Sequence, residues 1–271
     1  MNYDPAQRIP VVEYGRRCGI YVGKQSNPLT VAQYACKQLE LENITGPLVL
    51  PTIRETRTSQ YLRDATDWLL RNQRIGGRVS TWEYSYPWPN LGIQPPWRSA
   101  LAEAFGALVL LVVGKREDAR RHLQSLLVSF EKGGVAYVRE HELWFLEFVC
   151  QNPPLVLNCM LHCLLILDEC SHTIGDAELE KGFENAYRTL KRSLNQFDGG
   201  FFTYYDSRKN PADQKYHMLH VRLLEMLHER TGDQDLQPWI SRWKKFLQIY
   251  PVAEPVIFSM HILRSKGALY L

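Results

Sequence analysis

A carboxylate in an apolar setting is the first feature of this sequence that could do chemistry. Glu147 lies in the run LWFLEF at residues 143–148, where both of its neighbours are apolar. An unpaired carboxyl group is costly to bury, so we expect this side chain to be either exposed or functional. A positioned glutamate can act as a general acid or base.

A second candidate is a tyrosine within the segment KYHMLH. Tyr216 and His220 are four residues apart, and a helix beginning near residue 214 would put them on one face. His220 could then hydrogen-bond to the phenol or orient it. The same spacing puts Tyr216 on an apolar stripe with Leu219 and Leu223, which equally fits a core tyrosine.

Aromatic residues are concentrated in the segment 82–97. The chain has seven Trp and fourteen Tyr, and this segment combines aromatic rings with prolines. The rings are Trp82, Tyr84, Tyr86, Trp88 and Trp97, and the prolines are Pro87, Pro89, Pro95 and Pro96. Such rings can fill a core or stack on sugars, and composition does not separate the two uses. Because the segment is polar and rich in proline, we expect part of it to form a sugar-stacking platform.

Composition and charge are those of an ordinary globular protein. The chain has 271 residues, of which 45% are hydrophobic and 23% charged. This composition indicates a folded protein rather than disorder, and the length allows one large or two small domains. The sequence contains no low-complexity linker and no long charge run, so we expect one domain. The net charge of +3 is too small to indicate a nucleic-acid-binding protein. The basic residues gather in two clusters, which fit either a solvated helix face or a rim that attracts a polyanion: Arg116, Arg120 and Arg121, and Arg188, Lys191 and Arg192.

Several other features are expected to be absent. The first residues lack the pattern of a secretory signal, and the most apolar segment, 104–113, is too short to span a bilayer. We therefore expect a cytoplasmic protein that does not contact membranes. The six Cys form no zinc set, so we expect mostly buried thiols and no metal. No phosphate-binding glycine motif is present, so no cofactor is expected.

Amphipathic periodicity dominates the rest of the chain and predicts helices joined in pairs. The predicted helices cover residues 28–42, 59–73, 98–114, 117–131, 154–171, 176–196, 214–230 and 235–249. Three loops between them, 74–97, 133–153 and 198–213, each contain Gly-Gly followed by a β-prone run, which predicts short hairpins. We expect an all-α domain over 25–271, with residues 1–24 as an arm. Stacked helix pairs would form an α/α toroid whose loops line a cleft.

Five segments in order resemble the C-terminal domain of D-glucuronyl C5-epimerases. They are NPLTVAQYA (27–35), YLRDATDWLLRNQRIGG (61–77), PPWRSALAEAFGALVLL (95–111), GGVAYVREHELWFLEFVCQNPPLVLN (133–158) and TYYDSRKNPADQKYHMLHVRLLEML (203–227). The likeness covers about residues 25–248 and implies an α/α toroid. It also implies inversion of C5 of a uronic acid within a polysaccharide such as heparosan. The β-rich N-terminal domain of that family is not found in this sequence.

The resemblance also implies a set of site residues. The family's facing acid/base groups match Glu147, Tyr205 and Tyr216, and its carboxylate-binding arginine matches Arg208. The expected substrate-binding set is Arg208, Asn158, His217, His220, Trp97, Trp82 and Trp144. The implied partner is an acidic polysaccharide, without nucleic acid or membrane, and a homodimer is possible.

Two departures leave other functions open. Phe148 stands where the family has a tyrosine, and phenylalanine cannot transfer a proton. Asp213 and Lys215 rearrange the charges before Tyr216, which leaves a substrate other than heparosan open. The first alternative is a polysaccharide lyase, which shares the proton abstraction and then expels the substituent at C4. The second is a glycan-binding protein without catalysis.

Overall fold

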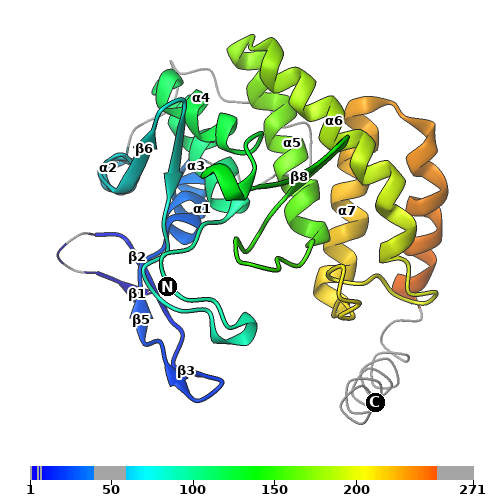
Figure 1. Cartoon of the computed structure of the whole chain (residues 1–271), viewed down its shortest axis with the longest axis horizontal. Coiled ribbons are helices and arrows are strands. Elements are labelled where there is room, and N and C mark those ends of the chain that lie inside the picture. The colour runs from blue at the N-terminus through cyan, green and yellow to red at the C-terminus, as the bar shows by residue number, and fades with distance from the viewer. Residues whose placement is uncertain (1, 5, 7, 40–58, 249–271) are drawn as a thin grey trace.

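The computed structural model describes residues 2–4, 6, 8–39 and 59–248, and it is mostly helical (Figure 1). The helices are α1 (Pro28–Gln38), α2 (Gln60–Asn72), α3 (Ala100–Val112), α4 (Arg116–Ser125), α5 (Leu157–Ile174), α6 (Ala177–Ser193) and α7 (Gln214–Thr231), and residues 237–248 are also helical. Short 3₁₀ turns lie at Pro89–Leu91, Phe130–Lys132, Leu194–Phe197 and Gln234–Leu236. The predicted helix over 117–131 is too long, because α4 ends at Ser125. The ends of two predicted helices, residues 40–42 and residue 249, lie outside the residues that the structure describes, as do residues 250–271 of the predicted domain.

The helices are arranged as an inner row with partners packed against it. In the inner row, α1 packs on α3, α3 on α5, and α5 on α7. The helices α2, α4 and α6 each pack on the helix that precedes them in the chain. Every residue of α3 is buried, which explains why its sequence is apolar all round. The predicted helix pairs are therefore present.

Local sequence signals explain where the helices begin and end. The side chains of Asn27, Ser59 and Asp213 accept hydrogen bonds from backbone N–H groups in the first turns of α1, α2 and α7. Gly175 and Gly232 end α5 and α7 in the left-handed conformation that glycine adopts without strain.

Within the described residues, four small antiparallel β-structures accompany the helices. The pairs β6–β7 (Gln73–Gly76 and Val79–Trp82) and β8–β9 (Ala136–Arg139 and Glu142–Phe145) are two-stranded ribbons in two of the predicted hairpin loops. The third loop, 198–213, is held by isolated bridges. Before α1, β1 (Asn2–Tyr3), β2 (Pro10–Glu13) and β5 (Lys24–Gln25) form a sheet, and β3 (Arg16–Arg17) pairs with β4 (Ile20–Tyr21). The fold is thus mostly helical rather than purely α.

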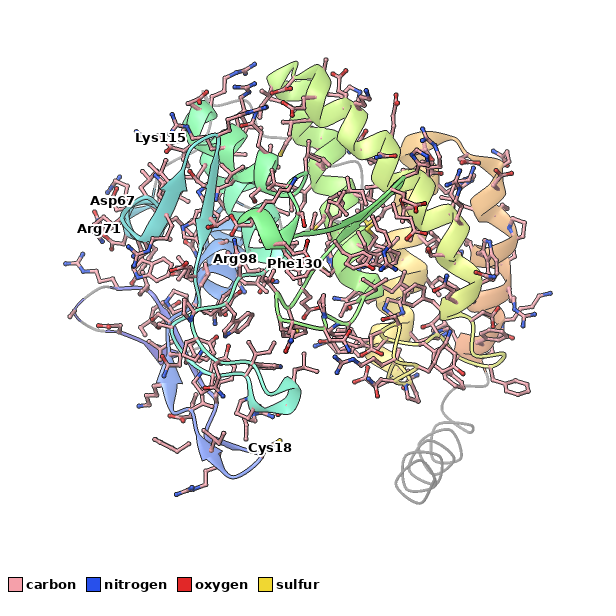
Figure 2. All side chains as sticks on the ribbon, in the orientation of Figure 1. Cys18, Asp67, Arg71, Arg98, Lys115 and Phe130 are labelled. Carbon is pink, nitrogen blue, oxygen red and sulfur yellow. The ribbon has the colours of Figure 1, made fainter. Side chains whose placement is uncertain are left out.

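Loops from distant parts of the chain gather at one end of the helices. In Figure 1 the segments 83–97, 147–156 and 198–213 all lie at the lower end of the helices. Arg98 fastens the first of them to the turn after α4, because its guanidinium donates to the carbonyl oxygens of Phe130 (3.2 Å) and Gly133. Figure 2 shows Arg98 and Phe130 side by side near the centre of the view.

We expect Gly106→Ala to destabilise the fold. A Cβ atom at Gly106 would lie 2.4 Å from the Trp82 ring. The ring cannot move aside easily, because it stacks on His122 and its indole N–H donates to the Leu69 carbonyl oxygen at 2.8 Å. Urea unfolding should show a loss of about 1–3 kcal/mol, the usual cost of overpacking. Gly76→Ala is the matched control, because nothing lies within 4 Å of its added Cβ atom. Equal stability of both variants would contradict the prediction.

The described residues contain neither a helix suited to crossing a bilayer nor a cluster of three or more His, Cys, Asp or Glu side chains suited to a metal ion. All six cysteines are free thiols. Cys36, Cys159, Cys163 and Cys170 are buried, Cys150 is half-buried and Cys18 is exposed. The prediction of mostly buried thiols is confirmed.

Candidate active site

Glu147 and Tyr205 meet at the loop end of the helices. Glu147 follows strand β9, and backbone hydrogen bonds from Leu146 to Val135 and from Ala100 to Leu146 hold its segment in place. The Tyr205 hydroxyl, from the loop between α6 and α7, lies 3.2 Å from Oε1 and 3.1 Å from Oε2 of Glu147 and donates to this carboxyl group. Two residues 58 positions apart are thereby brought into direct contact.

The segment that carries Tyr205 is fixed against the start of α5. The Leu157 N–H donates to the Tyr205 carbonyl oxygen at 3.1 Å, and the Ser207 N–H donates to the Leu155 carbonyl oxygen at 2.9 Å. The Ser207 hydroxyl oxygen also accepts from the Leu155 N–H at 3.0 Å. These bonds limit the movement of the phenol relative to the carboxyl group.

Tyr216 joins this pair from the first turn of α7. Its ring lies edge-on to the Tyr205 ring, with 4.9 Å between the centroids and 72° between the planes. The Tyr216 side chain is half-buried, and the Asp213 side chain accepts from its backbone N–H at 2.8 Å. The three predicted catalytic residues, Glu147, Tyr205 and Tyr216, therefore lie in one cluster.

The environment divides this cluster into an ionisable carboxyl group and two phenols that keep their protons. Burial raises the pKa of Glu147 to about 7, the nearby Asp206 charge also raises it, and the hydrogen bond from Tyr205 opposes both. Burial and the Glu147 charge raise the pKa of Tyr205 well above its ordinary value. Burial and the Glu147 charge also raise the pKa of Tyr216, and the Asp213 charge raises it further. Near neutral pH the carboxylate can accept a proton and the phenols can donate one.

Asp206 is a site residue that the sequence analysis did not single out. It is buried, and its carboxylate accepts from the backbone N–H groups of Arg208 (3.0 Å) and Asn210 (3.2 Å) and from the Asn210 side chain (2.7 Å). Arg208 is exposed, and its guanidinium donates to the Asn152 carbonyl oxygen at 2.6 Å. Asp206 thus shapes the turn that presents Arg208. The sequence feature that could have identified Asp206 is its place in the segment YYDSR, between Tyr205 and Arg208.

Asn158 offers a buried polar atom near the start of α5. Its side chain is only 5% exposed, and its Oδ1 has no hydrogen-bond partner among the described residues. Its backbone oxygen accepts from the His162 ring at 2.8 Å. A buried acceptor without a partner is costly, so Oδ1 is available to a ligand hydroxyl or a water molecule.

The structure corrects the expectation for His217 and His220. Both rings are completely buried and are joined through Thr203, whose hydroxyl lies 3.0 Å from Nδ1 of His217 and 2.8 Å from Nδ1 of His220. The other ring nitrogen of His217 donates to the Trp243 carbonyl oxygen at 3.1 Å. Burial lowers the pKa of both rings, that of His220 to about 3. These neutral histidines hold the loop against α7. Nδ1 of His220 contacts Thr203, and its Nε2 has no hydrogen-bond partner among the described residues, so no hydrogen bond joins this ring to the Tyr216 phenol.

The tryptophans also differ from the expectation of sugar stacking. Trp82 and Trp144 are each 1% exposed and Trp97 is 5% exposed. Their faces are occupied, since Trp82 stacks on His122, Trp144 on Phe197 and Trp97 on Tyr84. They are core residues, because the ribbons and loops that carry them pack inward on the helices.

Phe148 forms an apolar wall next to Glu147. Its ring is half-buried and stacks near Trp88, with 5.7 Å between the centroids and 22° between the planes. The Trp97 ring lies 5.9 Å away. The Phe148 position is therefore part of an aromatic cluster, where the resembling family has a phenol.

Comparison with known proteins identifies the family. Residues 75–245 match the family described as D-glucuronyl C5-epimerase C-terminus. The chain belongs to this family. The matched range includes all the site residues described above, which confirms the relationship expected from the five sequence segments.

The chain is also similar to two known proteins and one solved structure. An uncharacterized protein of Methanocaldococcus jannaschii is 24% identical over 259 residues, covering 88% of this chain and 82% of that protein. The D-glucuronyl C5-epimerase of Caenorhabditis elegans is 28% identical over 219 residues, covering 71% of this chain but only 36% of the enzyme. A crystal structure of D-mannose isomerase has a TM-score of 0.49 at 9% identity, over 86% of this chain and 65% of that one.

Proposed function

We propose that this chain is a carbohydrate epimerase that inverts C5 of a uronic acid within an acidic polysaccharide. The observation that supports the proposal is the Glu147–Tyr205–Tyr216 cluster, in which the carboxyl group has a pKa of about 7 and both phenols stay protonated. The inner row of helices with outer partners supports an incomplete α/α toroid as the scaffold. In this arrangement the loop end would hold the polymer.

The proposed reaction moves one proton off C5 and returns another. The Glu147 carboxylate takes the C5 proton, and the electron pair of the broken C–H bond moves into the uronate carboxyl group. The Tyr216 hydroxyl then delivers a proton to C5 from the opposite face, and solvent restores both groups. No electron is gained or lost, so the reaction needs no oxidant.

The carboxyl group of the substrate must be neutralised for the intermediate to form. Arg208 is the proposed partner, because a guanidinium binds a carboxylate through two parallel hydrogen bonds. The Asp206 turn holds its backbone in place. Asn158 Oδ1 would accept from a sugar hydroxyl.

Solvent isotope exchange tests the proposal. The chain is incubated with a glucuronate polymer in D₂O, and the polymer is then examined by NMR for deuterium at C5 and for the C5 epimer. Deuterium together with epimer supports the proposal. Absence of deuterium with glucuronate and other uronate polymers would refute it.

A polysaccharide lyase is the second candidate, and one observation favours it. Tyr205 and Glu147 are hydrogen-bonded to each other, so a base and an acid stand side by side. Such a pair could remove the C5 proton and protonate the departing oxygen at C4 from the same face. A new ultraviolet-absorbing unsaturated uronate, with chain cleavage, would decide for this reaction.

Phe148→Tyr tests whether the missing phenol limits activity. The new hydroxyl would stand in the aromatic wall, at the residue that follows Glu147, and could serve as a further proton donor. We expect deuterium exchange to rise by about 100-fold, the lower end of the roughly 10²–10⁴-fold effect of a positioned acid or base. Trp88→Tyr is the control, because it adds a phenol to the neighbouring ring of the same wall. Exchange that appears only in Phe148→Tyr would instead support a glycan-binding protein without native catalysis.

A further inference from the structure

A hollow lies beside the base of the β6–β7 ribbon, apart from the catalytic cluster. Its volume is about 450 Å³, within the range of roughly 300–1,000 Å³ typical of small-molecule sites. The lining residues that bear on its chemistry are Trp68, Asn72, Arg74, Glu83, Ser85 and Pro96. They come from α2, the ribbon and the segment 83–97.

The segment after β7 separates this hollow from Glu147. Side chains alternate along an extended segment, and here Tyr84 and Tyr86 are buried while Glu83 and Ser85 are exposed. The two tyrosines pack with Trp97, which in turn contacts the Phe148 wall. Glu83 and Ser85 line the hollow on the other face. The hollow is therefore a separate site.

The charges in the hollow are balanced. Nε of Arg74 lies 3.5 Å from Oε2 of Glu83, and these side chains are 74% and 37% exposed. An anionic ligand would face the Glu83 carboxylate, and a cationic one would face the Arg74 guanidinium. A neutral ligand with hydroxyl or amide groups could bond to both, because the pair supplies donors and acceptors.

The remaining lining suits a ring with apolar faces. Trp68 and Pro96 provide hydrocarbon and aromatic surface, and Ser85 adds a hydroxyl group. The Asn72 amide is oriented by its hydrogen bond to the Trp68 carbonyl oxygen at 2.8 Å. Apolar surface next to a few oriented polar groups is the usual composition of a small-molecule site.

We propose that this hollow binds a neutral sugar residue, such as an N-acetylhexosamine. The choice of a sugar rests on the proposed function, since a polysaccharide contains neutral residues beside its uronates. The hollow would then give the protein a contact with the polymer that is independent of the catalytic carboxylate.

Fluorine NMR of protein labelled with 5-fluorotryptophan tests the proposal. The Trp68 signal is assigned as the one missing from Trp68→Phe, and methyl N-acetylglucosaminide and methyl glucuronide are titrated separately. We expect the neutral sugar to shift the Trp68 signal with saturation. The glucuronide should bind about tenfold more weakly, because its carboxylate would have to displace Glu83 from Arg74 and would then lie beside the Glu83 carboxylate.

Three variants locate the binding. Ser85→Phe should fill the hollow and remove the shift, and since Ser85 is exposed the variant should fold. Ser241→Phe, at an exposed position outside the hollow, and Glu147→Gln should both retain the shift. No saturable shift, a shift that persists in Ser85→Phe, or tighter binding of the glucuronide would overturn the proposal. Deuterium exchange at C5 is measured in a separate experiment. If the hollow does not bind the neutral sugar, the proposed C5 reaction is therefore not contradicted.

Discussion

Glu147→Gln is expected to lower the rate of C5 deuterium exchange by roughly 10²–10⁴-fold, the contribution of a positioned general base. The amide keeps the size of the side chain and can still accept from the Tyr205 hydroxyl, but it cannot take up the C5 proton. The rate is measured by NMR on a glucuronate polymer in D₂O. Glu142→Gln, at an exposed position in β9, is the matched control and should keep full activity.

The same residue should govern the dependence of the rate on pH. Because Glu147 must be deprotonated to act as a base, the rate should rise with pH through about 7, where its raised pKa lies. A rate that rises instead near pH 4.5, the ordinary carboxyl value, would contradict the assignment.

Stability provides an independent readout of the Glu147 carboxyl group. A raised pKa means that the folded state binds the proton more tightly than the unfolded state. Its contribution to stability is complete below about pH 4.5 and is lost as the pH rises through about 7. The neutral amide in Glu147→Gln does not incur this loss. The melting temperature of the variant should therefore rise relative to that of the native chain between pH 5 and pH 8.5, and a constant difference would argue against a raised pKa of Glu147.

Tyr205→Phe is expected to shift the pH–rate profile toward higher pH and to slow deuterium exchange near neutral pH. The phenol hydrogen bond lowers the pKa of Glu147, so removing it should raise that pKa. A hydrogen bond to a charged group contributes about 1.5–3 kcal/mol, which corresponds to roughly one to two pKa units. Half of the Glu147 carboxyl groups are deprotonated at pH 7 when the pKa is about 7, so the rate at pH 7 should fall by about 5–50-fold and recover in part at higher pH.

A neighbouring tyrosine provides the control for this variant. Tyr204 packs edge-on to Phe202 and does not belong to the Glu147 cluster, so Tyr204→Phe should leave the profile unchanged. If Tyr205→Phe lowers the rate equally at every pH, the phenol acts on the substrate directly and not through Glu147.

The sequence alone predicted most of the helices and part of the candidate site. The apolar period of 3.6 residues, together with caps such as Asn27 and Gly232, predicted where helices occur, because those signals act between residues within a few turns. The order of the five segments indicated the family, which the comparison confirms. That resemblance also singled out Glu147, Tyr205 and Tyr216, which lie together in the fold.

The tertiary structure decided which of the remaining candidates face solvent. His217 and His220 are buried because Thr203, 14 and 17 residues before them, packs between their rings. Trp82 is buried because Gly106 leaves room for its ring in α3. Periodicity describes one face of one element, whereas burial depends on what packs against that face from elsewhere in the chain. For the same reason, only the three-dimensional arrangement produced the contact of Tyr205 with Glu147 and the supporting role of Asp206.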